Sequence, residues 1–184
     1  NPIRVVVFID NSNVYRRLKE LKEIDKQWIY LYDPLRLAKK LAGDRNLAGV
    51  YFYCTPPPSQ MLTTTEGKEN FSIQTKYYNE IQKLPEVEVK FGNLQGSAGD
   101  LREKNIDTQL TATMVTLSAQ NKFDTAILVS NDGDYLSAVE PTKDTFNKKI
   151  ELVYFKNGFI STSLWKIADV RRRARPSFFE RLKF

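Results

Sequence analysis

Residues 3–10 read IRVVVFID, a continuous apolar run that ends in an acidic residue. A run of this kind is typical of a strand that is buried on both faces of a parallel sheet, because a half-exposed strand would alternate apolar and polar residues. The first strand is therefore predicted to lie in the interior of the sheet. Four later segments have a similar apolar character and are also predicted strands: residues 47–54, 87–91, 124–130 and 149–155.

Helical patterns alternate with these strands. Ser12 or Asn13 can cap a helix that ends near residue 21, and Asp33 followed by Pro34 is a common helix opening, here for a helix that ends near residue 41. Residues 55–67, with three consecutive prolines, and the glycine-rich residues 92–100 are predicted loops. Further helices are predicted at residues 68–84, 101–120 and 134–146, and a short one near Leu164.

Alternating strands and helices predict an α/β domain with parallel strands and right-handed crossovers. If the first three strands build outward and the fourth returns beside the first, the strand order is 3-2-1-4-5. Ligands of such open sheets bind in the crevice where the strand order reverses, at the carboxyl ends of the strands. We therefore expect the functional residues to follow the first and fourth strands.

Composition narrows the chemistry available to the chain. Its 184 residues suit one domain, and they include no histidine and a single cysteine, Cys54. Histidine-based catalysis and zinc sites built from histidine or several thiolates are excluded, so any metal must be held mainly by oxygen atoms. No apolar run approaches the roughly 20 residues of a membrane span. We therefore expect no membrane partner. We also expect a cytoplasmic protein, since one cysteine cannot form an internal disulfide.

Positive charge is concentrated at the C-terminal end of the sequence. The net charge is +6, and residues 170–184 contain six basic residues against one acidic residue, Glu180. We therefore divide the chain into a domain at residues 1–169 and a basic tail at residues 170–184. A near-neutral domain with a basic tail fits a polyanionic partner such as RNA, although a solvated terminus has the same composition.

Aspartates occur at the two strand ends where the crevice is expected. Asp10 ends the first strand, and Asp132 and Asp134 follow the fourth. Asp107 lies early in the predicted helix that leads into the fourth strand. Carboxylates that meet in one place repel each other unless a cation neutralises them, and hard oxygen ligands favour Mg²⁺ or Mn²⁺. Taken singly, each aspartate could instead cap a helix or face solvent.

Three blocks of this sequence resemble the signature motifs of the NYN domain family, in particular its LabA-like branch, which is related in fold to PIN nucleases. The blocks are FIDNSNVY at residues 8–15, EKNIDTQL at residues 103–110 and AILVSNDGDYLSAV at residues 126–139. Ala168 followed by Asp169 also resembles that branch. The resemblance implies a three-layer α/β/α PIN-like sandwich with a parallel sheet of five to six strands, and cleavage of RNA that depends on Mg²⁺ or Mn²⁺.

The same resemblance implies roles for individual residues. It assigns catalytic and metal-binding roles to Asp10, Asp107, Asp132 and Asp134. It also implies that Asn13 and Ser130 line the pocket and that Lys104 lies beside the phosphate of the substrate. Independently of the family, basic residues near the crevice, Arg16, Arg17, Arg102 and Lys104, can contact an RNA backbone, and Tyr15, Tyr53 and Tyr135 can either stack on unpaired bases or pack against helices.

Other functions are compatible with the sequence. Thr113 stands six residues after Asp107, where family members often have another aspartate, and this favours a non-catalytic RNA- or protein-binding module as the alternative. A haloacid dehalogenase would need an aspartate where Ser12 lies. A homodimer is compatible with the sequence, and unstructured or single-stranded RNA is the expected substrate.

Overall fold

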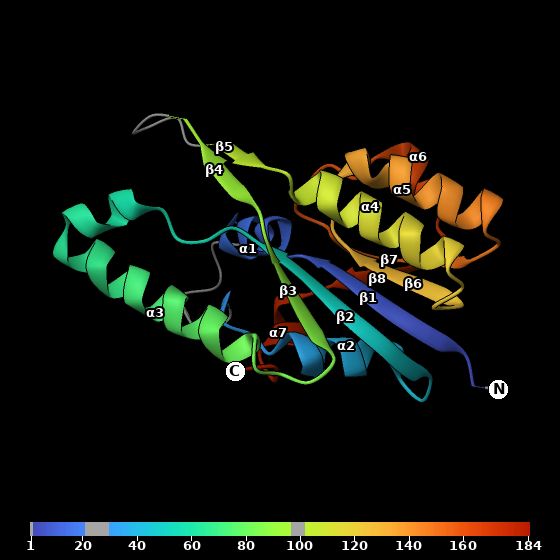
Figure 1. Ribbon diagram of the computed structural model, residues 1–184, viewed down its shortest axis with the longest axis horizontal. Helices are drawn as coiled ribbons and strands as arrows, with labels where there is room; N and C mark the ends of the chain where they lie inside the picture. The colour runs from blue at the N-terminus through green and yellow to red at the C-terminus, as the bar shows by residue number, and fades with distance from the viewer. Residues whose placement is uncertain (1, 21–29, 97–101) are drawn as a thin grey trace.

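The structure is a computed structural model that describes residues 2–20, 30–96 and 102–184. Its centre is a parallel six-stranded sheet with the order β3-β2-β1-β6-β7-β8 (Figure 1). The predicted α/β class and the order of the first five strands are confirmed, and a sixth strand adds to the edge beyond the fifth. The strands are β1 (Arg4–Asp10), β2 (Asn46–Cys54), β3 (Val87–Phe91), β6 (Thr125–Val129), β7 (Lys149–Phe155) and β8 (Val170–Ala174).

Helices cover both faces of the sheet and make two hydrophobic cores (Figure 1). One core lies against α1 (Asn11–Glu20), α2 (Pro34–Ala42), α3 (Thr65–Ile81) and α7 (Pro176–Phe179). The other lies against α4 (Ile106–Ala119), α5 (Leu136–Glu140) and α6 (Thr162–Ile167). The sheet is thus the middle layer of a three-layer sandwich.

β1 explains why its sequence is apolar without interruption. Val5, Val7 and Ile9 point into one core, whereas Val6 and Phe8 point into the other. All five side chains are at most 2% exposed, because successive residues of a strand face opposite sides of the sheet and both sides are covered here.

Two predictions between the third and fourth parallel strands are wrong. The helix expected from residue 101 begins at Ile106, and part of the predicted glycine-rich loop is the strand β4 (Asn93–Gln95), which pairs antiparallel with β5 (Arg102–Lys104). Asn105 separates β5 from α4 with a φ of 74°, a left-handed conformation that helical residues do not adopt. Residues 97–101, and the expected helix end at residue 21, lie outside the described residues.

The helix predicted at residues 134–146 exists in three shorter pieces. A 3₁₀ turn, η3 (Gly133–Tyr135), leads into α5, and a π-helical turn, η4 (Pro141–Thr145), follows. Pro141 stands at the first position of that turn, where its missing N–H costs least. The helix opening at Asp33 and Pro34 is confirmed, since the Asp33 side chain accepts hydrogen bonds from the N–H groups of Leu35 and Arg36.

The C-terminal segment is part of the fold and not a separate tail. β8 pairs in parallel with β7, and Phe179 and Leu182, at 0% and 4% exposed, pack in the core beside α2. Arg172 forms an ion pair with Glu151 of β7 at 2.9 Å. Sequence analysis missed this strand because its arginines give no apolar pattern. β8 is an edge strand, and exposed charged side chains are common on edge strands. None of the helices in the described ranges is both long and apolar enough to cross a membrane.

Candidate functional site

A pocket of about 250 Å³ lies at the carboxyl ends of β1 and β6, where the strand order reverses. The four predicted aspartates all line it, although they come from three separate segments of the chain: Asp10, Asp107, Asp132 and Asp134. Glu103 of β5 adds a fifth carboxylate. We call this cavity the carboxylate pocket. Two basic side chains, Lys104 and Arg16, also line it and can partly balance its negative charge.

Asp10 is the buried member of this group, at 4% exposed. Its Oδ1 accepts a hydrogen bond from the backbone N–H of Asn13 at 3.0 Å, which caps the start of α1. Its Oδ2 accepts hydrogen bonds from the hydroxyls of Ser130 and Tyr135, both at 3.0 Å. Three donors therefore fix the Asp10 carboxylate, and Oδ1 keeps a lone pair for one more partner.

Burial disfavours the charged form of the Asp10 carboxylate. Burial raises the pKa of Asp10 from 3.8 to about 6, and the three hydrogen bonds only partly oppose that rise. Burial also raises the pKa of Tyr135, and the charges of Asp10, Asp132 and Asp107 raise it further. Carboxylates from β1, from α4 and from the end of β6 thus act on one hydroxyl group, and a cation here would relieve their repulsion.

Asparagines tie the strand ends together below the carboxylates. Asn13 Oδ1 accepts a hydrogen bond from the N–H of Asn131 at 3.1 Å, which joins α1 to the end of β6. Asn131 in turn exchanges two hydrogen bonds of 2.7 Å with the backbone of Phe155 on β7. Asp132 caps η3 through the N–H of Asp134 at 3.0 Å, and a Cβ on Gly133 would come within 2.8 Å of the Ser161 Cβ. Asn13 and Asn131 are therefore structural cross-links between α1, β6 and β7.

The oxygen atoms of these side chains suit a hard divalent cation in their chemistry, but the distances between the side chains suit it less well. Asp107, Asp132 and Asp134 are exposed and can turn, and every donor is an oxygen, as Mg²⁺ and Mn²⁺ prefer. Among residues 2–20, 30–96 and 102–184, however, no three carboxylates lie close enough together to hold one ion as they stand. Because Mg²⁺ usually keeps several of its waters, two direct carboxylates with others bound through water satisfy the same site.

The remaining predicted residues lie in different places. Lys104 and Asn13 line the carboxylate pocket. Ser130 is fully buried beneath it, where its hydroxyl donates to Asp10 and accepts from the N–H of Asp132 at 3.1 Å. Arg102 lies on β5 outside the lining, and Arg17 bonds Glu20 at 2.8 Å.

Three tyrosines were expected to stack on bases or to pack against helices, and the structure separates them. Tyr135, at 1% exposed, lies under the pocket and donates to Asp10, so it supports a carboxylate and does not present a ring to solvent. Tyr53 is fully buried in the core. Tyr15, at 38% exposed, remains available on the surface of α1. Sequence analysis could not separate them because each lies near the carboxyl end of a predicted strand.

Glu103 and Ser12 were missed as members of the site. Ser12 Oγ donates to Glu103 Oε1 at 2.6 Å and so joins the start of α1 to the β4–β5 hairpin. The only signal in the sequence was the position of both residues inside conspicuous motifs, because the hairpin that brings them together is formed from short polar strands.

A parallel six-stranded sheet between two helical layers, with carboxylates at the reversal of strand order, defines a PIN-like α/β/α sandwich. The chain belongs to the NYN domain family, part of the PIN-like nuclease superfamily, since the family model matches residues 4–172. It is similar in fold to the crystal structure of a protein of unknown function from Vibrio parahaemolyticus, with a TM-score of 0.65 and 18% identity over 95% of this chain and 94% of that one. Comparison with curated proteins gives no significant match.

Proposed function

We propose that the chain is a ribonuclease that hydrolyses RNA phosphodiester bonds with Mg²⁺ or Mn²⁺ in the carboxylate pocket. One observation carries this proposal: aspartates separated by up to 124 residues, from Asp10 to Asp134, line a single pocket with Lys104 and Arg16 beside them. A bound divalent cation would supply an activated water and neutralise charge on the phosphate. We further assign the chain to the LabA-like branch, on the strength of its three motifs and the Ala168–Asp169 pair.

Each side chain has a part in this scheme. Asp10 and Asp132 are the direct ligands that we favour, because Asp10 is held rigidly and Asp132 caps the turn beside it. Asp107 and Asp134 would hold the ion directly or through water, and one exposed carboxylate of the pocket would take the proton of the attacking water. Lys104 and Arg16 bind the phosphate oxygens. The water oxygen forms the new bond to phosphorus, and the leaving ribose oxygen departs with a proton from solvent.

The expected substrate is unpaired RNA. A duplex would hold its bases away from the protein, whereas a single strand can follow the basic side chains around the pocket. The arginines of β8 are a second contact for the RNA backbone, since Arg171 and Arg173 are exposed on the edge of the sheet. We place this activity in the cytoplasm, where a lone buried thiol such as Cys54 stays reduced.

A non-catalytic binding module is the second candidate, and two observations favour it. No three described carboxylates are within reach of one ion as they stand. Thr113 also supplies no carboxylate, and its hydroxyl donates to the backbone carbonyl of Gln109 at 2.8 Å. Such a binding module would hold RNA or a protein partner on the face that carries the carboxylate pocket, without cutting RNA.

Cleavage of unstructured RNA separates the two candidates. The ribonuclease should degrade it with Mn²⁺ or Mg²⁺, stop with EDTA, and lose activity in Asp10→Asn and in Asp132→Asn. Asp144→Asn, an exposed aspartate on η4 outside the carboxylate pocket, is the matched control and should cut normally. RNA that is bound but never cut with either ion would reject the ribonuclease and leave the binding module.

A further inference from the structure

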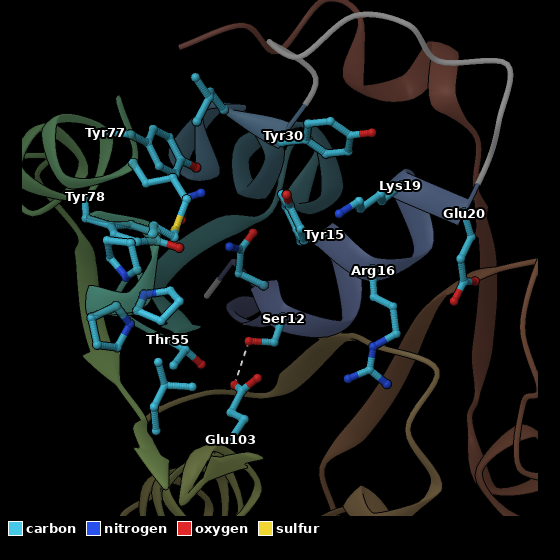
Figure 2. A pocket seen from close by; sticks show the side chains of 18 residues that line it. Ser12, Tyr15, Arg16, Lys19, Glu20, Tyr30, Thr55, Tyr77, Tyr78 and Glu103 are labelled. Atoms are coloured by element: carbon cyan, nitrogen blue, oxygen red, sulfur yellow. Dashed lines mark hydrogen bonds between the residues drawn. The ribbon is translucent and has the colours of Figure 1, made fainter. Parts of the chain in front are cut away.

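A second and larger cavity, drawn in Figure 2, shares lining residues with the carboxylate pocket. Its volume is about 690 Å³, inside the range of about 300–1,000 Å³ that is usual for small-molecule sites. Its lining includes four tyrosines and three prolines, and we call it the tyrosine pocket. The prolines, Pro56, Pro57 and Pro58, follow β2 after Thr55.

Tyrosines stand on two sides of this cavity (Figure 2). Tyr15 and Tyr30 lie on the side of α1, with ring centroids 4.9 Å apart. Tyr77 and Tyr78 belong to α3 on the other side, with ring centroids 5.5 Å apart. A flat aromatic ligand between them would have tyrosine rings on both sides, and stacking on aromatic side chains is how unpaired nucleobases are commonly held.

A hydrogen-bonded pair of side chains lies at the junction of the two pockets. Ser12 and Glu103, joined at 2.6 Å, line both cavities, and Figure 2 shows this pair at one end of the tyrosine pocket. A ligand in the tyrosine pocket therefore lies one side chain away from the carboxylates. Glu103 keeps a second carboxylate oxygen that can accept a hydrogen bond from an exocyclic amino group of a base.

The charges favour a ligand that carries a phosphate. Arg16 also lines both pockets, and it has no hydrogen bond or ion pair with the residues that the structure describes. Lys19 lies at the same opening, 5.9 Å from the centre of the Tyr15 ring. The acid nearest to them along α1, Glu20, is already paired with Arg17. An anionic group bound by Arg16 would stand at the junction of the two cavities.

We propose that the tyrosine pocket binds an unpaired nucleobase of the RNA substrate, with the adjoining phosphate on Arg16 and directed toward the carboxylate pocket. This inference rests on the proposed function, because it names the part of the substrate that positions the bond to be cut. Tyr15 and Tyr78 are the stacking residues, and Glu103 contacts the edge of the base. Bases with an amino group are preferred over uracil.

Binding of single nucleotides tests this inference without any cleavage step. We would titrate the metal-free protein in EDTA with the 5′-monophosphates of adenosine, guanosine, cytidine and uridine, and follow amide signals by NMR. Saturable shifts should appear on α1, on α3 and at Glu103. Tyr15→Ala should weaken binding about tenfold, since base–aromatic stacking has that order of effect. Tyr15→Phe should bind within about threefold of the wild type.

Two controls decide what the pocket recognises. Ribose 5-phosphate lacks the base and should bind at least about tenfold more weakly than AMP if stacking provides the affinity. Phe159→Ala removes an aromatic side chain that is 82% exposed and lines neither pocket, and it should leave binding unchanged. Equal binding of ribose 5-phosphate, an unchanged affinity in Tyr15→Ala, or no saturable binding of any nucleotide would overturn the inference.

These outcomes are independent of the proposed activity. A protein that binds nucleotides through Tyr15 but never cuts RNA would retain the base site and reject the ribonuclease. A protein that cuts RNA but shows none of these nucleotide effects would retain the ribonuclease and reject the base site.

Discussion

The two pockets that share Ser12 and Glu103 differ in size and in chemistry. The carboxylate pocket measures about 250 Å³ and collects acidic oxygens from strand ends and from α4. The tyrosine pocket measures about 690 Å³, and its lining includes four tyrosines and three prolines. A small acidic pocket suits an ion and a reacting phosphate, whereas a larger aromatic pocket suits a part of the substrate that does not react. In the function that we propose, this difference separates the reaction from the recognition of the substrate.

The largest expected effect comes from comparing one substitution in each pocket. Asp10→Asn should lower kcat for RNA cleavage by more than about 100-fold, because even residues that only support metal ligands are typically worth 10- to 100-fold. Tyr15→Ala should mainly raise KM, by about tenfold, since it removes binding to a base that does not react.

Steady-state kinetics on a short single-stranded RNA with Mn²⁺ measures both constants. The comparison between the pockets fails if Tyr15→Ala lowers kcat as much as Asp10→Asn does, or if Asp10→Asn changes KM alone.

The next effect concerns the stability of the metal-free protein. Asp10 has a pKa raised from 3.8 to about 6, so the folded state binds a proton more tightly than the unfolded state between these values. Its contribution to the free energy of unfolding is therefore greatest below about pH 4 and is lost as the pH rises through about 6, by roughly 2–3 kcal/mol. Asp10→Asn should remove this dependence and be the more stable protein at pH 7.5.

Urea unfolding in EDTA at pH 5 and at pH 7.5 provides the measurement for both proteins. Asp124 does not confuse the result, because its ion pair with Arg4 lowers its pKa to about 2 and its effect falls below this window. Two results together would contradict this prediction: a wild-type free energy of unfolding that stays level or rises between pH 5 and pH 7.5, and an Asp10→Asn variant that is less stable. They would show that burying the charged Asp10 carboxylate does not destabilise the fold.

A smaller effect should follow from Tyr135→Phe. The hydroxyl of Tyr135 donates to Asp10 Oδ2 at 3.0 Å, and its loss removes one of the three hydrogen bonds that fix the carboxylate. We expect cleavage to need more Mn²⁺ and to fall by about tenfold, while nucleotide binding in the tyrosine pocket stays unchanged.

Tyr78→Phe is the matched control, because it removes a tyrosine hydroxyl from the other pocket. An identical shift in Mn²⁺ dependence in both variants would show that the hydroxyl of Tyr135 has no special role in the carboxylate pocket.

The smallest effect is expected at β8, whose residues line neither pocket. Arg171→Gln combined with Arg173→Gln should weaken RNA binding by about threefold and reduce its salt dependence, because each lost phosphate contact lowers the slope by about 0.7 for single strands. Arg172→Gln breaks the pair with Glu151 and should lower stability more than RNA affinity. Fluorescence anisotropy at several salt concentrations measures the RNA affinity, and urea unfolding measures the stability. Equal RNA affinity in the wild type, the double variant and Arg172→Gln would exclude β8 from the RNA contact.

Much of the scaffold could be predicted because its sequence signals are local. The uninterrupted apolar run of β1 requires burial on both faces, and that requirement placed β1 in the middle of the sheet. The strand order then brought Asp10 and Asp132 to one edge, and the pocket they line with Asp107 and Asp134 follows from that order.

The parts that escaped prediction depend on contacts between distant segments. β8 reads VRRRA and has no apolar pattern, because only its pairing with β7 makes it a strand. The β4–β5 hairpin is short and polar, and Glu103 enters the site only through it. The tyrosine pocket is built from α1, α3, the prolines after β2 and this hairpin, so no single stretch of sequence indicates it.

A crystal soaked in Mn²⁺ tests the central claim most directly, because anomalous scattering locates the ion without regard to activity. The account predicts Mn²⁺ in the carboxylate pocket, bound by Asp10 Oδ1 and by Asp132, with Asp107 or Asp134 reaching it directly or through water. Full Mn²⁺ occupancy elsewhere on the protein, with Asp10 still bonded only to Asn13, Ser130 and Tyr135, would contradict it.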